Sequence, residues 1–128
     1  MISKDGFSRF IEKSAITEYD KQKGFIYKWI KVYDKLIKHG TILIVYLTES
    51  HPVFGSVCSI AETEVDIIKI TFQLFETLGY DQHLHAYYVK LQNDIKTEEL
   101  QEIDKLHVNC LYHMSYDGNS LININSSV

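Results

Sequence analysis

The pattern of apolar and polar positions is clearest between Gly40 and Thr48. Ile42 to Leu47 is the longest unbroken apolar run in the chain, and it is rich in β-branched residues. Such a run is short for a helix, and because no polar residue alternates within it, a strand here would need cover on both faces. The pattern therefore predicts a central strand that is buried on two sides.

The first part of the chain has helical spacing. Ser3 is suited to cap a first helix, and the residues from Thr17 to Asp20 have the form of a capping box. Apolar residues then recur at intervals of three and four, most regularly from Phe25 to Lys38. Basic residues and Gly40 close this stretch, as is typical of a helix C-terminus. The pattern predicts helices within residues 4–38.

Residues 61–78 fit two patterns. With a period of two they form a strand, and with a helical period they form two apolar stripes. Acidic residues gather at the start of the segment and Gly79 follows its end, as is typical of a helix. We therefore predict a largely buried helix.

Shorter patterns predict three further elements. Residues 56–60 and 83–91 are rich in strand-forming residues. The polar segment 94–105 contains Thr97 followed directly by two acidic residues, as at a helix start. We predict two strands and a short exposed helix.

The end of the chain alternates between apolar and polar residues over 106–125, which predicts a hairpin. Keeping Met114 opposite Ile122 on one apolar face requires an odd number of residues in the loop. This favours a three-residue turn, Asp117-Gly118-Asn119, over a two-residue Asp-Gly turn.

Together these elements predict one α+β domain spanning residues 1–128. Helices of residues 4–38 and 61–78 would pack on a sheet of four or five strands, largely antiparallel or mixed. The order of two helices, short strands, a third helix and later strands resembles the cone-shaped fold of ketosteroid-isomerase-like proteins. That resemblance implies a sheet curled around an apolar pocket.

Composition indicates a globular protein, with 45% hydrophobic and 23% charged residues. The N-terminus lacks the apolar core of a signal peptide, and no segment approaches the length of a membrane span. We therefore predict a cytoplasmic protein, and in such a reducing compartment the two cysteines are expected to be free thiols. Lysine far outnumbers arginine, a bias that hints at a bacterial or phage source.

The net charge of −4 is unevenly distributed. Residues 1–38 contain eight lysines and Arg9 against five acidic residues, whereas residues 39–128 contain four lysines against twelve acidic residues. A basic segment and an acidic body can attract each other, within one molecule or between two copies. The overall acidity weighs against nucleic acid as the main partner.

Four lysines would share one side of the predicted helix over residues 25–38. They form a candidate partner-binding surface: Lys28, Lys31, Lys35 and Lys38. Any amphipathic surface helix shows such a charged stripe, and the aromatic residues between the lysines belong to its apolar side. An acidic protein surface, including that of a second copy, is the partner that fits best.

Histidines invite a metal hypothesis. His83 and His85 lie on one predicted strand, and His107 and His113 on another, so that imidazoles from neighbouring strands would suit zinc, iron or copper. No fixed metal signature is present, and a solvated sheet face gives the same pattern, so we predict no metal and no cofactor. His85, His113 and Tyr87 are instead candidates for lining a ligand pocket.

The segment Glu49-Ser50-His51 follows the predicted central strand, a common place for a binding crevice. Glu49 and His51 are candidates for an acid–base pair, and Ser50 for a nucleophile. The sequence identifies neither a partner base nor an oxyanion hole for the serine. A solvated connecting loop is the simpler interpretation.

The sequence contains no catalytic motif, phosphate-binding loop or metal signature. It therefore favours a non-enzymatic interaction protein of the small accessory type, acting as a homodimer. The alternative is a small-ligand-binding protein, or a lyase- or isomerase-type enzyme, with a cone-shaped pocket lined by histidine and tyrosine.

Overall fold

The described part of the chain is built from β-strands. The computed structural model describes residues 11–32, 35–64, 67–83, 85–100, 112–116 and 119–123. These residues form eleven strands. The strands pair antiparallel in two sheets. The predicted α+β class is therefore wrong, and the resemblance to the cone-shaped fold is lost with its helices.

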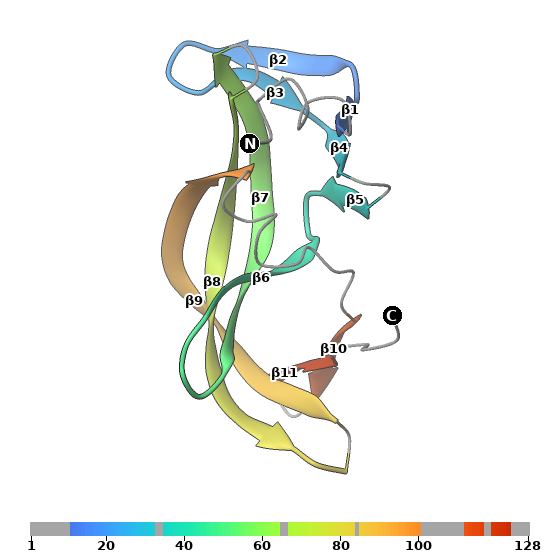
Figure 1. Cartoon of the computed structure of the whole chain (residues 1–128), viewed down its shortest axis with the longest axis vertical. Coiled ribbons are helices and arrows are strands. Elements are labelled where there is room, and N and C mark those ends of the chain that lie inside the picture. The colour runs from blue at the N-terminus through green and yellow to red at the C-terminus, as the bar shows by residue number, and fades with distance from the viewer. Residues whose placement is uncertain are drawn as a thin grey trace, which may run out of the picture.

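Three long consecutive strands form the frame of the larger sheet. They are β7 (Pro52–Glu64), β8 (Ile67–Asp81) and β9 (Ala86–Glu99), which pair side by side. They curve along the length of the molecule (Figure 1). The pairing shifts by extra residues at several points, as at Cys58 in β7 and Leu78 in β8. Such bulges increase the bend and twist of a strand, which suits the curvature of this sheet.

Two different partners share the outer side of β7. The strand β6 (Ile42–Leu47) pairs with its first part, and β3 (Gly24–Tyr27) pairs with its last part. The strand β2 (Ile16–Asp20) then pairs with β3 and ends the sheet on that side.

On the other side of the larger sheet, β11 (Asn119–Asn123) pairs with β9, and β10 (Tyr112–Tyr116) pairs with β11. The predicted hairpin is confirmed, but its register is wrong. Met114 pairs with Leu121, and only two residues separate the paired Tyr116 and Asn119.

Burial of β11 on both faces explains the register error. The prediction assumed that one face of the hairpin is apolar and the other polar. Leu121 and Ile122, which point to opposite faces, are instead 3% and 0% exposed. The remaining residues of the predicted hairpin, 106–111, 117–118 and 124–125, lie outside the described residues.

The smaller sheet has three strands, β1 (Ile11–Lys13), β4 (Trp29–Val32) and β5 (Lys35–Lys38), with β4 in the middle. It packs on the larger sheet through one apolar cluster. Ile30, Ile37 and other residues of the small sheet meet residues of β6, β7 and β8 there. The buried members of this first cluster are Ile30, Val32, Ile37, Leu43, Val45, Val57, Ile60, Ile68, Ile70, Phe72 and Leu100.

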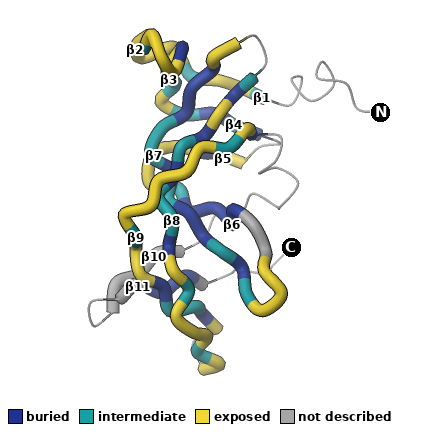
Figure 2. Tube along the Cα trace, turned by 90° about the vertical axis from the view of Figure 1, so that its left-hand side faces the viewer, coloured by how far each residue is buried: buried dark blue, intermediate teal, exposed yellow. Residues whose placement is uncertain are grey.

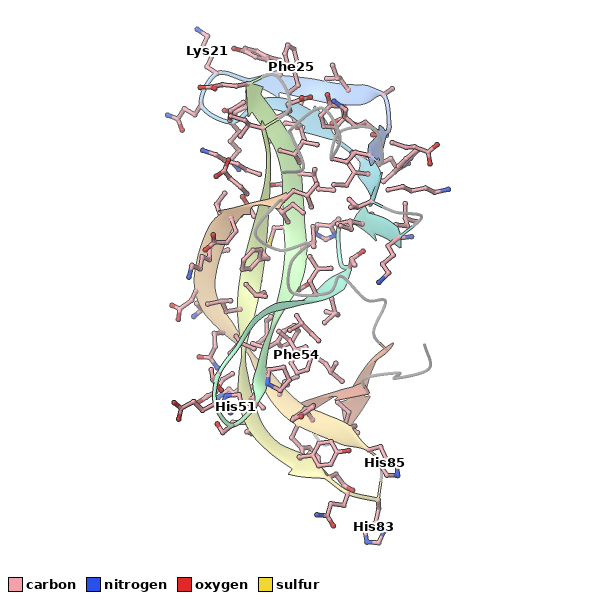
Figure 3. All side chains as sticks on the ribbon, viewed as in Figure 1. Lys21, Phe25, His51, Phe54, His83 and His85 are labelled. Atoms are coloured by element: carbon pink, nitrogen blue, oxygen red, sulfur yellow. The ribbon has the colours of Figure 1, made fainter. Side chains whose placement is uncertain are left out.

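A second apolar cluster lies toward the end of the larger sheet that carries β10 and β11. Phe54 belongs to it, and Figure 3 shows this ring turned into the space enclosed by the lower strands. Its buried members are Ile42, Ile44, Phe54, Phe75, Val89 and Ile122.

The strand β6 contributes to both clusters. Leu43 and Val45 belong to the first, and Ile42 and Ile44 belong to the second. The predicted burial on two sides is therefore confirmed for these residues. The predicted central position is wrong, because among the described strands β6 pairs with β7 alone.

The predicted helices are strands. Residues 25–38 form parts of β3, β4 and β5, residues 61–78 run from the end of β7 into β8, and residues 94–99 belong to β9. Residues 4–10, 33–34, 65–66 and 101–105 of the same predictions lie outside the described part. The predicted strand 56–60 is confirmed as part of β7, and the predicted strand 83–91 begins only at Ala86.

The alternation of buried residues in β8 explains why this segment forms a strand and not the predicted helix. Ile68, Ile70 and Phe72 are buried, and the residues between them are more exposed. This is the period of two that the helical interpretation set aside. Glu62 and Glu64, two of the acidic residues that suggested a helix start, belong to the end of β7, which pairs with β8.

Candidate interaction surface

The outer edge of β9 is the longest unpaired strand edge among the described residues. The strand β11 covers only Ala86–Val89. From Lys90 to Glu99 no described strand pairs on this side, and most of the side chains are exposed. Figure 2 shows most of this stretch of β9 as exposed. A long exposed edge offers backbone donors and acceptors to another strand.

An irregularity divides this edge in two. Gln73 pairs with Ile95 and Phe75 pairs with Leu91, so three residues of β9 oppose one residue of β8. Beyond this bulge, Ile95–Glu99 pair with β8 in regular register. We call Ile95–Glu99 the edge segment. The next residue, Leu100, is 1% exposed and packs in the first cluster, so the chain leaves the edge there.

The edge segment has two faces of different character. Lys96 Nζ lies 3.5 Å from Glu98 Oε1, which places a positive and a negative charge side by side on one face. Thr97 and Ile95 point to the other face. The Thr97 hydroxyl lies 2.9 Å from that of Thr71 on β8, and Ile95 is 59% exposed. The segment thus combines an apolar side chain with paired opposite charges.

The structure also contains a polar cluster around the buried carboxylate of Glu62. Glu62 on β7 is 8% exposed. Its carboxylate accepts hydrogen bonds from Tyr27 Oη at 2.6 Å and from Lys13 Nζ at 3.1 Å. Lys13 belongs to the small sheet, and its Nζ also lies 5.6 Å from the centre of the Tyr27 ring. These three residues tie the two sheets together with charge-assisted hydrogen bonds.

Glu62→Gln is expected to lower the pKa of Tyr27. In the folded protein, burial first and then the Glu62 carboxylate raise the pKa of Tyr27 from 10.0 to about 12. Folding therefore favours the neutral phenol, so its contribution to stability is present below pH 10 and is lost as the pH rises toward 12. NMR titration of the tyrosine ring carbons checks this, with Tyr27→Phe to assign the signal. A wild-type midpoint near 10 would contradict the expectation.

The predicted catalytic residues lie in the exposed loop between β6 and β7. Ser50 Oγ lies 2.8 Å from His51 Nδ1, and the Thr48 hydroxyl donates to the His51 carbonyl at 2.8 Å. Glu49 is exposed in the same turn. These contacts are those of a polar turn, in which neighbouring residues satisfy one another. An acid–base role for Glu49 and His51 stays a prediction.

His51 borders an open groove of about 430 Å³. A second open groove, of about 470 Å³, lies beside the edge segment and is lined by Ile67 and by polar residues of β7, β8 and β9. Both are open to solvent, unlike the enclosed apolar pocket that the cone-shaped fold implied. The lining residues of the first groove are His51, Val53, Leu74, Phe75, Glu76, Thr77, Gln92 and Asp94.

The residues predicted to line a ligand pocket, His85, Tyr87 and His113, lie on different elements of the structure. Tyr87 packs between Tyr80 and Phe54, with ring centres 4.8 and 5.7 Å away. His85 lies in the turn before β9, where Tyr80 Oη is 3.5 Å from its Nδ1. His113 on β10 pairs with Ile122 on β11, and Ile122 in turn pairs with Tyr87 on β9, so one strand separates His113 from Tyr87. Tyr87 is thus part of an aromatic row, and ligand binding here stays a prediction.

The weak metal alternative gains no support within the described residues. His83 and His85 both lie at the tip between β8 and β9, well away from His51 (Figure 3). His107 lies outside the described part, and the placement of the His113 side chain is not described. No group of three histidine, cysteine, aspartate or glutamate residues in the described ranges is arranged to hold a metal ion.

The four lysines do not share a helix face. Lys28 lies between β3 and β4, Lys31 lies on β4, and Lys35 and Lys38 lie on β5. Lys35 pairs with Val32 and Lys31 pairs with Leu36, so these two lysines point to opposite faces of the small sheet. The geometry of the predicted surface is wrong, and a role in partner binding stays a prediction.

Sequence reasoning missed both the edge segment and Glu62. Thr97 and the acidic residues after it resembled a helix start, although Ile95 and Thr97 also alternate with Lys96 and Glu98. That alternation was the available signal for a strand. The sequence signal for Glu62 was weaker: it is an acidic residue that directly follows the apolar residues Ile60 and Ala61.

Comparisons with known proteins leave the function open. No protein-family model, characterised protein or solved structure matches the chain. Within the described residues there is no helix of the length and apolarity that crossing a membrane requires. The predicted cytoplasmic location stays a prediction.

Proposed function

We propose that this protein is a non-enzymatic interaction protein that acts as a homodimer and uses the outer edge of β9 to bind its second copy. The observation that carries the proposal is the exposed, unpaired edge from Lys90 to Glu99 among the described strands. Strand addition at such an edge supplies backbone hydrogen bonds along the whole contact, and side chains give specificity.

Two further observations favour a second copy as the partner. The edge segment carries both charge signs in adjacent positions of one face, so it can complement itself. Ile95 in the same segment is 59% exposed, so a second copy bound at this edge would cover an apolar side chain. A surface that is complementary to itself is what a two-fold dimer requires.

Dimer formation is expected to protect the outward-facing backbone amides within Ile95–Glu99. Sedimentation velocity should show a concentration-dependent species of twice the 14.9 kDa chain mass. Hydrogen exchange should then slow at the outward-facing amides of the edge segment as the protein concentration rises, because these amides become bonded to the second copy, whereas the alternate amides already face β8.

The strand β2 provides the matched control, because it is also an exposed edge of the larger sheet. Its amides should exchange at the same rate in monomer and dimer. A monomer at every concentration would overturn the proposed function. So would a dimer that protects β2 and leaves the edge segment unchanged.

A further inference from the structure

The geometry of the edge segment points to one register for the pairing. We infer that the two copies pair antiparallel with Thr97 on the two-fold axis, facing Thr97 of the second copy. Lys96 of each copy then faces Glu98 of the other, and Ile95 faces Glu99. This inference rests on the proposed function and specifies its interface.

Symmetry limits the registers that are possible. In an antiparallel pair, hydrogen-bonded and non-hydrogen-bonded residue pairs alternate along the strand. A two-fold axis must map each pair onto one of the same type, so a residue of one copy has to face the same residue of the other. Only registers centred on a residue satisfy this condition.

Charge and regularity select among these registers. An axis at Lys96 would set two lysines against each other, and an axis at Glu98 would set two glutamates against each other. An axis at Ile95 would draw the bulged residues Gln92–Asp94 into the pairing. The axis at Thr97 keeps all five pairs between the bulge and Leu100, where the strand is regular and ends.

The Thr97 register also extends contacts that already exist. Lys96 and Glu98 lie 3.5 Å apart within one copy. Two such pairs would meet across the axis as four alternating charges on one face. On the other face, the Thr71–Thr97 contact would continue into the second copy as a row of four threonines. The two larger sheets would then form one sheet across the dimer.

Charge-exchange variants test the register. Lys96→Glu and Glu98→Lys are each expected to weaken self-association at least about tenfold, because like charges then face each other twice. An equimolar mixture of the two variants should dimerise as well as wild type, since every facing pair is again opposite in charge. Sedimentation velocity and native mass spectrometry measure both results.

The mixture separates contacts between copies from contacts within one. Each single variant loses its internal ion pair between positions 96 and 98, and mixing does not restore that pair. Only a contact between copies is restored. A mixture that stays monomeric would therefore overturn the register.

Asp94→Lys controls for the neighbouring register. With the axis at Ile95, residue 94 would face Lys96 of the second copy, and this variant would weaken the dimer. With the axis at Thr97 it should leave the dissociation constant within about twofold of wild type. If Asp94→Lys weakens the dimer and Glu98→Lys does not, the register is wrong, because with the axis at Ile95 residue 98 would face the neutral Gln92. Concentration-dependent protection of the edge segment would still support the proposed function. A monomeric wild type would instead refute that function.

Discussion

Gly24→Ala is expected to lower the free energy of unfolding by about 3–5 kcal/mol, a large part of the stability of a typical domain. Gly24 is buried and has a φ of +97°, which side chains other than glycine rarely adopt. A Cβ here would collide with the carbonyl oxygen of Glu62 and would lie 2.9 Å from Thr63 Cα. Because these are backbone atoms of a paired strand, they cannot move aside cheaply. Urea unfolding followed by circular dichroism measures the change.

Two other glycines separate the causes of this loss. Gly40 also has a positive φ, +90°, but a Cβ there would meet nothing within 4 Å. Gly40→Ala should therefore cost only the backbone strain, about 1–2 kcal/mol. At Gly79 the backbone needs no positive φ, and an added Cβ would meet nothing within 4 Å. Gly79→Ala should therefore change the free energy of unfolding by no more than about 0.5 kcal/mol. Equal losses for Gly24→Ala and Gly40→Ala would refute the proposed collision with β7.

Phe72→Ala should cost about 3–5 kcal/mol. Phe72 is fully buried in the first cluster, where the small sheet meets the larger one. Its ring lies directly over Gly55, where an added Cβ would come within 2.9 Å of Phe72 Cδ2. Removing the ring would leave a cavity between backbone and side chains that are held by strand pairing, so the site cannot collapse to fill it. Thermal unfolding and urea unfolding both check this expectation.

Phe25→Ala is the matched control for that variant. Phe25 is an aromatic residue of the same sheet, but it is 44% exposed and packs mainly against Tyr19 on β2. Its removal should cost about 1 kcal/mol or less. If both phenylalanines cost the same, Phe72 would not have the central place in the core that the structure gives it.

Burial was easier to predict from this sequence than secondary structure. The run Ile42–Leu47 predicted cover on both faces, and both faces are covered at Ile42–Val45. The same argument placed β6 in the centre of a sheet, because a buried strand usually has strands on both sides. Here other elements cover its faces, while β7 alone among the described strands pairs with its edge. Burial of a strand's faces and pairing of its edges are separate properties. A hydrophobic run in the sequence indicates only that the faces are buried.

The helical predictions failed where several short strands follow one another. Bulges and turns shift the apolar residues out of strict alternation, so that intervals of three and four appear by chance. Within residues 25–38, for example, Ile30 and Ile37 are both buried. They belong to two paired strands, β4 and β5, and not to one face of a helix. Alternation within four residues is too short a signal to outweigh apparent helix caps.

The candidate surfaces depended on contacts that spacing does not show. Lys13 and Glu62 are 49 residues apart and meet only because β1 and β7 belong to sheets that pack together. The edge segment was recognisable only after the strand order was known, because an edge is defined by the strands that are absent beside it. The charged residues of both regions were visible in the sequence, but their partners were not.

The order of the strands has a consequence for synthesis on the ribosome. Ile30, Val32 and Ile37 leave the ribosome before Val57, Ile60 and Ile70, against which they pack in the first cluster. The smaller sheet therefore remains without its apolar cover until β7 and β8 have been made. A nascent chain that stalls before β8 is complete would expose that surface, so this interval is the time when the growing chain most needs a chaperone.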